Sequence, residues 1–187
     1  MTSPFSVLHV CTGNICRSPM SERILDGLTG DDVFNHGAGT GSWHVGDDMQ
    51  AGSRHELDTR GFVSAGHRAR HLERAHVEAS DLILVATEDH VDYITERFPE
   101  VLGRTFLVRQ FGFIVADLIE EGFAAPAGGD AAVRGKALVN AAAERTVDYP
   151  LVGLSDPWGM DQATYARIAD QLEEALKPVA LALESRL

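Results

Sequence analysis

The chain has 187 residues and a formal net charge of −12, with 44% hydrophobic and 24% charged residues. This length suffices for one domain with a hydrophobic core, and the composition is that of an ordinary globular protein. The acidic balance argues against nucleic acid as a partner, because a polyanion repels a negatively charged surface. We expect no membrane helix, since no apolar run reaches about 18 residues. We also expect no signal peptide at the N-terminus.

Segments with the pattern of buried strands alternate with segments of helical spacing. The apolar run Phe5–Val10 indicates a strand, and a helix is expected to open at Ser18-Pro19. Further strands are expected at 33–38, 81–86 and 105–108, and further helices at 53–60, 88–97, 111–121, 131–144 and 165–183. This alternation predicts an α/β fold: a single three-layer domain with a mostly parallel central sheet and helices on both faces.

An Ala- and Gly-rich spacer lies near residues 122–131, between two of the expected helices. Its composition is typical of a flexible loop, and we do not interpret it as a domain boundary.

The loop after the first strand carries the clearest functional signal. Cys11 and Arg17 are separated by five residues, and a helix follows. Backbone N–H groups of such a loop, together with the helix N-terminus, can bind a tetrahedral oxyanion. Arg17 supplies a planar fork for two phosphate oxygens. The same positive field favours the thiolate of Cys11, so the pattern predicts a nucleophile and a cysteinyl-phosphate intermediate. Ligands bind beyond the carboxyl ends of parallel strands, where this loop is expected.

The two cysteines of the chain, Cys11 and Cys16, both lie in this loop. A framework of structural disulfides is therefore excluded, and a reducing cytoplasmic location is expected. Two thiols without suitably spaced histidines do not make a four-ligand zinc site, so we expect no metal and no cofactor.

The motif and three later segments together resemble the low-molecular-weight protein tyrosine phosphatases. The run Cys11–Glu22, with the sequence CTGNICRSPMSE, resembles the family signature. The later segments are Ala38-Gly39-Thr40 followed by Trp43-His44, Gly66–Arg70 and Asp156-Pro157-Trp158. The resemblance runs from about Phe5 to the C-terminal helix and implies one phosphatase domain over residues 1–187.

The resemblance also implies roles for individual residues. Cys11 would be the nucleophile, Arg17 the phosphate clamp and Asp156 the general acid and base. Local sequence alone favours a turn residue before Pro157, which is a common structural use of aspartate. The loop that would bind phosphate consists of Thr12, Gly13, Asn14, Ile15, Cys16 and Ser18.

Three residues are expected to support the loop. Ser18 can donate a hydrogen bond to the Cys11 sulfur, although a helix N-cap is the alternative use of this serine. Asn14 tolerates left-handed backbone conformations and can brace the loop from its side chain. The resemblance implies that His67 joins this network; a solvated loop histidine is the alternative.

The rim and the second cysteine complete the expected site. Trp43 and Trp158 fall on the segments that resemble the family's rim loops, where aromatic walls suit a phenyl ring; core packing is the alternative. Gly159 stands where the family often has a second aromatic residue, which predicts a rim more open on one side. Cys16 is a candidate for redox protection through a reversible disulfide with Cys11, or a small packing residue.

The preferred function is hydrolysis of phosphotyrosine in proteins. Ile15 favours it, because the position resembles a threonine in the related protein-arginine phosphatases. Residues 87–90 (TEDH) instead resemble the bacterial arginine-phosphatase subgroup, so a protein-arginine phosphatase stays an alternative. An arsenate reductase is disfavoured because no further cysteines are available to relay a disulfide. A non-catalytic phosphoprotein binder is disfavoured because both Cys11 and Asp156 are retained. The expected partner is a phosphotyrosine-containing protein, and the sequence carries no signal for an oligomeric state.

Overall fold

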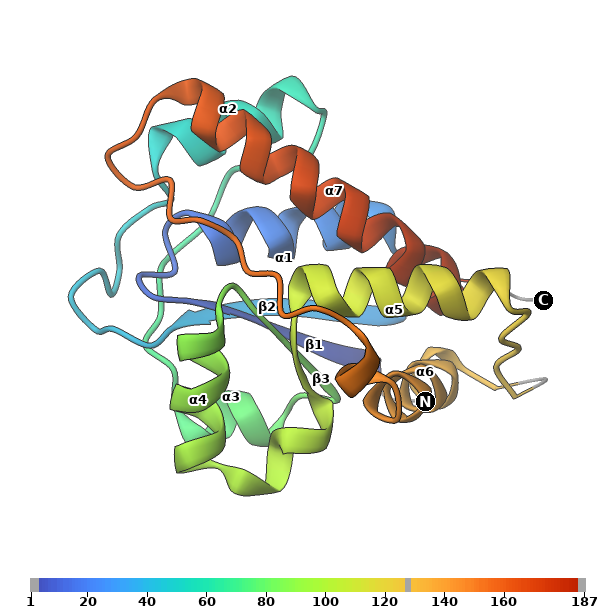
Figure 1. The fold of residues 1–187 in the computed structure, drawn as a ribbon. Helices are drawn as coiled ribbons and strands as arrows, with labels where there is room; N and C mark the ends of the chain where they lie inside the picture. Colours follow the sequence, from blue (N-terminus) through green and yellow to red (C-terminus); the bar gives the residue numbers. More distant parts are fainter. Residues whose placement is uncertain (1–3, 127–128, 185–187) are drawn as a thin grey trace.

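A four-stranded parallel sheet forms the centre of the molecule in the computed structural model, which describes residues 4–126 and 129–184 (Figure 1). The strand order is β2-β1-β3-β4, and each neighbouring pair is parallel. The strands are β1 (Phe5–Cys11), β2 (Val33–Gly39), β3 (Leu82–Val85) and β4 (Thr105–Leu107). The predicted α/β fold is confirmed, and its sheet is parallel throughout these four strands.

The helices are arranged around this sheet, most of them against one of its two faces. They are α1 (Arg17–Leu28), α2 (Ala51–Thr59), α3 (Arg74–Glu78), α4 (Glu88–Arg97), α5 (Val108–Glu120), α6 (Ala131–Ala143) and α7 (Gln162–Glu184), with 3₁₀ helices at Pro99–Arg104 and Thr146–Asp148. In Figure 1, α1, α5 and α7 lie on one side of the sheet, and α3 and α4 lie on the other. The three-layer arrangement follows from the parallel strands, which need a crossover on one face or the other between neighbours.

The side chains of β1 alternate between two hydrophobic cores. Phe5 and Val7 belong to the larger core, which includes apolar residues of α1, α5, α6 and α7. Leu8 and Val10 belong to the smaller core, with residues of α3 and α4. A strand buried on both faces has few positions left for polar side chains, which explains the nearly continuous apolar run that predicted it.

Two elements differ from the expectation. Val108 begins α5 rather than ending a strand, because it continues the helical spacing of Phe111 and Val115, and all three are fully or nearly fully buried. Helix α3 was not predicted, since five residues are too few to show a helical repeat. Its first turn is closed by a hydrogen bond from the Glu73 backbone N–H to His76 Nδ1, at 3.1 Å.

The predicted spacer near 122–131 lies partly outside the described residues, because residues 127 and 128 are among those not described. Residues 123–126 and 129–130 belong to neither helix nor strand. Helix α6, which follows, lies near the beginning of β1, at the opposite end of that strand from the Cys11 loop (Figure 1).

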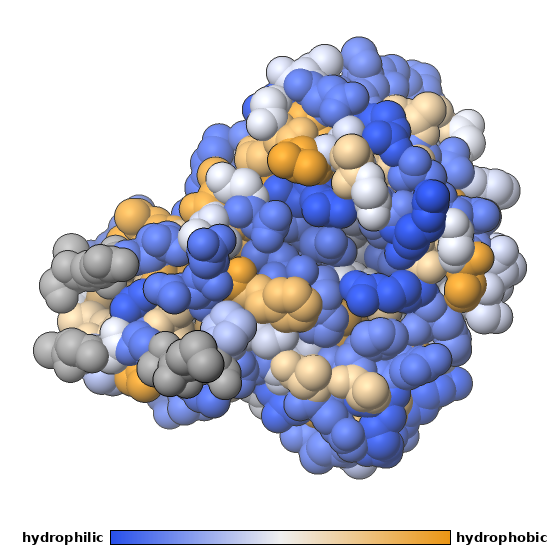
Figure 2. Space-filling view, turned by 180° about the vertical axis from the view of Figure 1, so that it is seen from behind, coloured by the Kyte–Doolittle hydropathy of each residue, from blue (hydrophilic) through white to orange (hydrophobic). Residues whose placement is uncertain are grey.

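Figure 2 shows a face on which hydrophilic residues predominate, while exposed hydrophobic residues form separate small groups. Within residues 4–126 and 129–184, no helix has the length and apolar character needed to cross a membrane.

The contact between α5 and α7 gives a test of the packing. A Cβ atom on Gly112 would lie 2.5 Å from the Ala175 carbonyl oxygen and 2.6 Å from its Cα. We expect Gly112→Ala to lower the free energy of unfolding by about 1–3 kcal/mol in denaturant titrations, although alanine favours helix more than glycine does. Gly103→Ala is the matched control, because no atom lies within 4 Å of the added methyl group. Equal losses in the two variants would contradict close packing at Gly112.

Candidate active site

Three loops that are distant in sequence meet around one cavity at the carboxyl end of β1. The cavity has a volume of about 160 Å³. Its lining residues are Cys11, Thr12, Gly13, Ile15, Cys16, Arg17, Trp43, His44, Asp156 and Trp158. The loop between β1 and α1 therefore forms the floor, and the segments around Trp43 and Trp158 form the walls. The fold thus brings together the nucleophile, clamp, acid and rim residues expected from the sequence.

Cys11 ends β1 and is almost completely buried, with its Sγ atom 3.1 Å from the Oγ atom of Ser18. The Asn14 side-chain amide donates to the same Ser18 oxygen at 2.8 Å. Because the amide N–H occupies one acceptor position of Ser18, the serine hydrogen is free to be donated to the sulfur. This geometry suits stabilisation of a thiolate. Ser18 itself lies in the first turn of α1, whose N-cap position is taken by Cys16.

Asn14 braces the loop from its centre. Its φ angle is +54°, and within the described residues it is the one residue other than glycine with a positive φ. The Asn14 Oδ1 atom accepts the backbone N–H of Arg70 at 2.9 Å, and its carbonyl oxygen lies 2.7 Å from His67 Nε2. A carbonyl can only accept, so His67 donates from Nε2. Burial lowers the pKa of His67, with the Asn14 carbonyl opposing the shift.

Arg17 is 5% exposed and is held by two groups of one other segment, residues 154–156. Its Nη1 atom donates to the Leu154 carbonyl at 3.2 Å, and its Nη2 atom donates to Asp156 Oδ2 at 2.8 Å. These two hydrogen bonds fix the orientation of the guanidinium, and one of them joins it to the Asp156 carboxyl group.

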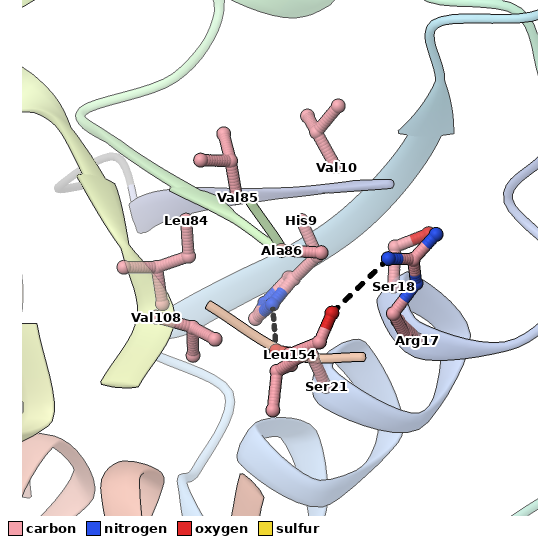
Figure 3. A pocket seen from close by; sticks show the side chains of 10 residues that line it. All are labelled: His9, Val10, Arg17, Ser18, Ser21, Leu84, Val85, Ala86, Val108 and Leu154. Carbon is pink, nitrogen blue, oxygen red and sulfur yellow. Dashed lines mark hydrogen bonds between the residues drawn. The ribbon is translucent and has the colours of Figure 1, made fainter. Parts of the chain in front are cut away.

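A small cavity of about 10 Å³ lies behind Arg17, and Figure 3 shows the bond from Arg17 to Leu154 at its edge. The polar ring of His9 borders this space, with Nδ1 at 2.7 Å from Ser21 Oγ and Nε2 at 3.1 Å from Asn35 Oδ1. Burial lowers the pKa of His9 to about 3. The ring is therefore neutral at pH 7 and fixes the base of α1 without adding charge beneath the site.

The walls of the cavity are exposed. Trp43 is 69% exposed and Trp158 is 61% exposed, so the alternative of core packing is wrong for both. The Asp156 side chain is 52% exposed, and its Oδ1 atom accepts the backbone N–H of Trp158 at 3.1 Å. Asp156 thus faces both solvent and cavity. Gly159, which follows Trp158, adopts a positive φ of +74°.

Cys16 lines the cavity as a free thiol, as does Cys11. Its Sγ atom is 3.8 Å from the hydroxyl oxygen of Tyr165 on α7. Burial raises the pKa of Cys16 to about 12, which keeps this thiol protonated at pH 7. The protonated thiol is the less reactive form of a cysteine.

Two histidines of the site were not assigned a role from the sequence. His44 lines the cavity, with Nδ1 at 2.8 Å from Asp47 Oδ2. His90 is buried, with Nε2 at 3.0 Å from the Thr12 hydroxyl oxygen. The available signal for His90 was its position three residues after Thr87, the spacing of a capping box at a helix start. Its contact with Thr12 connects residues 78 positions apart and has no sequence signal.

The described residues contain no group of three or more His, Cys, Asp or Glu side chains arranged to hold a metal ion. The polar groups that line the cavity include the Cys11 sulfur, the Arg17 guanidinium and the Asp156 carboxyl group. This set can hold an oxyanion, attack it and transfer a proton.

The chain is similar to known proteins over more than half of its length. The model of the family described as "Low molecular weight phosphotyrosine protein phosphatase" matches residues 6–118. The chain is 36% identical to a protein-arginine-phosphatase of Geobacillus stearothermophilus over 110 residues, 58% of this chain and 72% of that protein. It is also 36% identical to low molecular weight protein-tyrosine phosphatase A of Mycobacterium tuberculosis over 117 residues, 59% of this chain and 69% of that one.

A solved structure extends the likeness beyond these segments. The YwlE arginine phosphatase from Geobacillus stearothermophilus superposes with a TM-score of 0.70 at 26% identity, covering 95% of this chain and 91% of that chain. The chain belongs to the low-molecular-weight phosphotyrosine protein phosphatase family, and it is a phosphatase that acts on phosphoproteins.

The pH dependence of stability gives a test of the buried carboxyl group of Glu22, which lies near Asn14. A Cβ atom on Gly37 would lie 2.6 Å from Glu22 Oε2 and 2.9 Å from Asn14 Nδ2, so these two polar groups flank Gly37. Burial raises the pKa of Glu22 from 4.5 to about 7, with Arg23 and Arg70 opposing the shift. The folded state therefore binds this proton more tightly than the unfolded state does, and the resulting stabilisation is lost as the pH rises from 4.5 to 7.

Glu22→Gln is neutral at every pH and does not have this pH dependence. We therefore expect the free energy of unfolding of the variant, minus that of the wild type, to increase between pH 5 and pH 8. The gain should reach up to about 3 kcal/mol. Urea titrations of both proteins at the two pH values measure it. A difference between the proteins that does not change with pH would contradict the raised pKa.

Proposed function

We propose that this phosphatase hydrolyses phosphotyrosine in proteins through a cysteinyl-phosphate intermediate. The observation that carries the proposal is the single cavity in which Cys11, Arg17 and Asp156 meet between two exposed tryptophans. The nucleophile lies at the floor, the clamp beside it and the acid at the mouth. This order matches the order of groups along an aryl phosphate: phosphorus innermost, bridging oxygen next and ring outermost.

In the first step, the Cys11 thiolate attacks phosphorus and the bond from phosphorus to the phenolic oxygen breaks. Arg17 and the backbone N–H groups of the loop hold the non-bridging oxygens. Asp156 gives its proton to the departing phenolic oxygen. In the resting site Asp156 is bonded to Arg17, and an entering phosphoryl group competes for the same guanidinium. Substrate binding thus releases the carboxyl group towards the leaving oxygen.

In the second step, water attacks phosphorus and the bond from sulfur to phosphorus breaks. Asp156 takes a proton from the water, inorganic phosphate leaves, and the electron pair returns to the Cys11 sulfur. Ser18, 3.1 Å from that sulfur, donates to the thiolate as it reforms. The cysteinyl-phosphate cycle involves no metal and no cofactor.

Two features of the cavity favour an aromatic substrate. Trp43 and Trp158 present flat, exposed faces at the rim, and Ile15 adds an apolar side chain to the lining. Such walls suit a phenyl ring and cannot satisfy the hydrogen-bond donors of a guanidinium. A protein-arginine phosphatase is the second candidate, because a relative of that name is 36% identical over 72% of its length.

We further propose that residues 1–187 form one phosphatase domain and that Cys16 protects Cys11 by a reversible disulfide. A cytoplasmic location is consistent with two free thiols.

The first test is phosphate release from matched phosphotyrosine and phosphoarginine peptides. We expect preference for phosphotyrosine, no measurable release by Cys11→Ser and a loss of roughly 10²- to 10⁴-fold in kcat for Asp156→Ala. Vanadate should inhibit, chelators should not, and rapid mixing should show a burst of phenol. Full activity of Cys11→Ser would refute the mechanism, and preference for phosphoarginine would establish the second candidate.

Ile15 gives a test of substrate preference. We expect Ile15→Thr to raise the ratio of kcat/KM for phosphoarginine over phosphotyrosine by roughly 3- to 10-fold, because a hydroxyl group gives a polar contact where the wall was apolar. Ile15→Val is the control, since valine has the shape of threonine without the hydroxyl. The same shift in both variants would show that cavity size, not polarity, sets the ratio.

A further inference from the structure

His90 is a buried polar residue beside the active site that the proposed mechanism does not use. It lies in the first turn of α4 and is 4% exposed. Its Nε2 atom is 3.0 Å from Oγ1 of Thr12, a residue of the cavity floor. The helix start of α4 and the phosphate loop are therefore connected by a single side chain.

The surroundings of the ring fix which nitrogen carries the hydrogen. His90 Nδ1 lies 3.1 Å from the backbone N–H of Thr87 and 2.7 Å from the Thr87 hydroxyl oxygen. A backbone N–H can only donate, so Nδ1 accepts and the neutral ring carries its hydrogen on Nε2. Burial, and after it the charge of Arg17, lowers the pKa of His90 to about 4. At pH 7, His90 is thus a neutral donor aimed at Thr12.

This direction decides what the Thr12 hydroxyl can do. A hydroxyl group has one hydrogen to donate and two lone pairs that accept. Thr12 Oγ1 accepts from His90 Nε2 at 3.0 Å and from Arg17 Nη2 at 3.5 Å. Both neighbours are donors, so neither can take the Thr12 hydrogen. That hydrogen is left for an acceptor in the cavity that Thr12 lines.

We infer that His90 is a positioning residue that turns the Thr12 hydroxyl so that it donates to an oxygen of the bound phosphoryl group. The inference rests on the proposed function, because a phosphoryl group in the cavity provides the acceptor. Thr12 then adds a side-chain donor to the Arg17 fork and the backbone N–H groups. Without His90, one of the two donors that orient the Thr12 hydroxyl group is lost. The hydroxyl group can then rotate, and its hydrogen is no longer pre-organised towards the phosphoryl oxygen.

A purely structural role makes the opposite prediction for two conservative variants. His90→Asn keeps an acceptor near the position of Nδ1, so the cap on α4 is retained while the bond to Thr12 is lost. His90→Gln places an N–H donor near the position of Nε2, so the bond to Thr12 is retained while the cap is lost. If His90 serves α4 alone, the asparagine variant is the better enzyme. If it positions Thr12, the glutamine variant is.

The experiment measures kcat and KM for an aryl phosphate in both variants, each also combined with Thr12→Val. We expect His90→Gln to stay within about threefold of the wild type and His90→Asn to lose roughly 3- to 10-fold in kcat/KM. In the Thr12→Val background the two His90 variants should be equal, because the residue through which His90 acts is gone. His55→Asn, at an exposed position on α2, is the control for a histidine change elsewhere.

A higher kcat/KM for His90→Asn than for His90→Gln would overturn the inference. A difference between the two variants that persists in the Thr12→Val background would also overturn it. Vanadate affinity is measured in the same proteins through the fluorescence of Trp43 and Trp158, which needs no turnover. A wild type that binds vanadate without hydrolysing aryl phosphates would contradict the proposed function alone. The role of His90 would still be decided by whether His90→Gln or His90→Asn binds vanadate more tightly. A wild type that does not bind vanadate would refute both.

Discussion

The phosphate loop depends on one side chain, that of Asn14. Its backbone adopts a left-handed conformation, and its amide connects Ser18 on α1 with the backbone of Arg70. Through Ser18 the same amide sets the direction of the hydrogen bond towards the Cys11 sulfur. The strained backbone persists because three partners hold it, including His67 at the Asn14 carbonyl. Loop shape and the environment of the nucleophile are therefore set by the same contacts.

The segment that carries Asp156 is fixed to the rest of the site through Leu154. Its backbone N–H donates to the Ala86 carbonyl beyond β3 at 2.8 Å, and its own carbonyl accepts from Arg17. The sheet thus anchors the segment that carries Asp156, and the clamp joins it to the phosphate loop. Leu154 has no polar side chain, but its backbone N–H donates and its backbone carbonyl accepts. It therefore links the end of β3 with Arg17.

Charge in the site is concentrated at Arg17, although the chain as a whole carries a net charge of −12. Burial lowers the pKa values of His9, His67 and His90. These rings act as neutral hydrogen-bonding groups that fix α1, the loop and Thr12 in place. With neutral supports, the positive charge beneath the cavity is that of the Arg17 guanidinium, which the proposed mechanism uses to hold the phosphoryl oxygens.

The sequence by itself determined the parallel α/β fold and the order of the main elements, because buried strands and amphipathic helices leave periodic patterns in the chain. It also determined the phosphate loop, since Cys11, Asn14, Arg17 and Ser18 lie within eight consecutive positions and their spacing is local. Short elements such as α3 leave no period to detect. Only the tertiary structure decided that His90 reaches Thr12 and that Arg17 pairs with Asp156, 139 positions away. Contacts of that kind are made by the packing of whole elements, which no local pattern records.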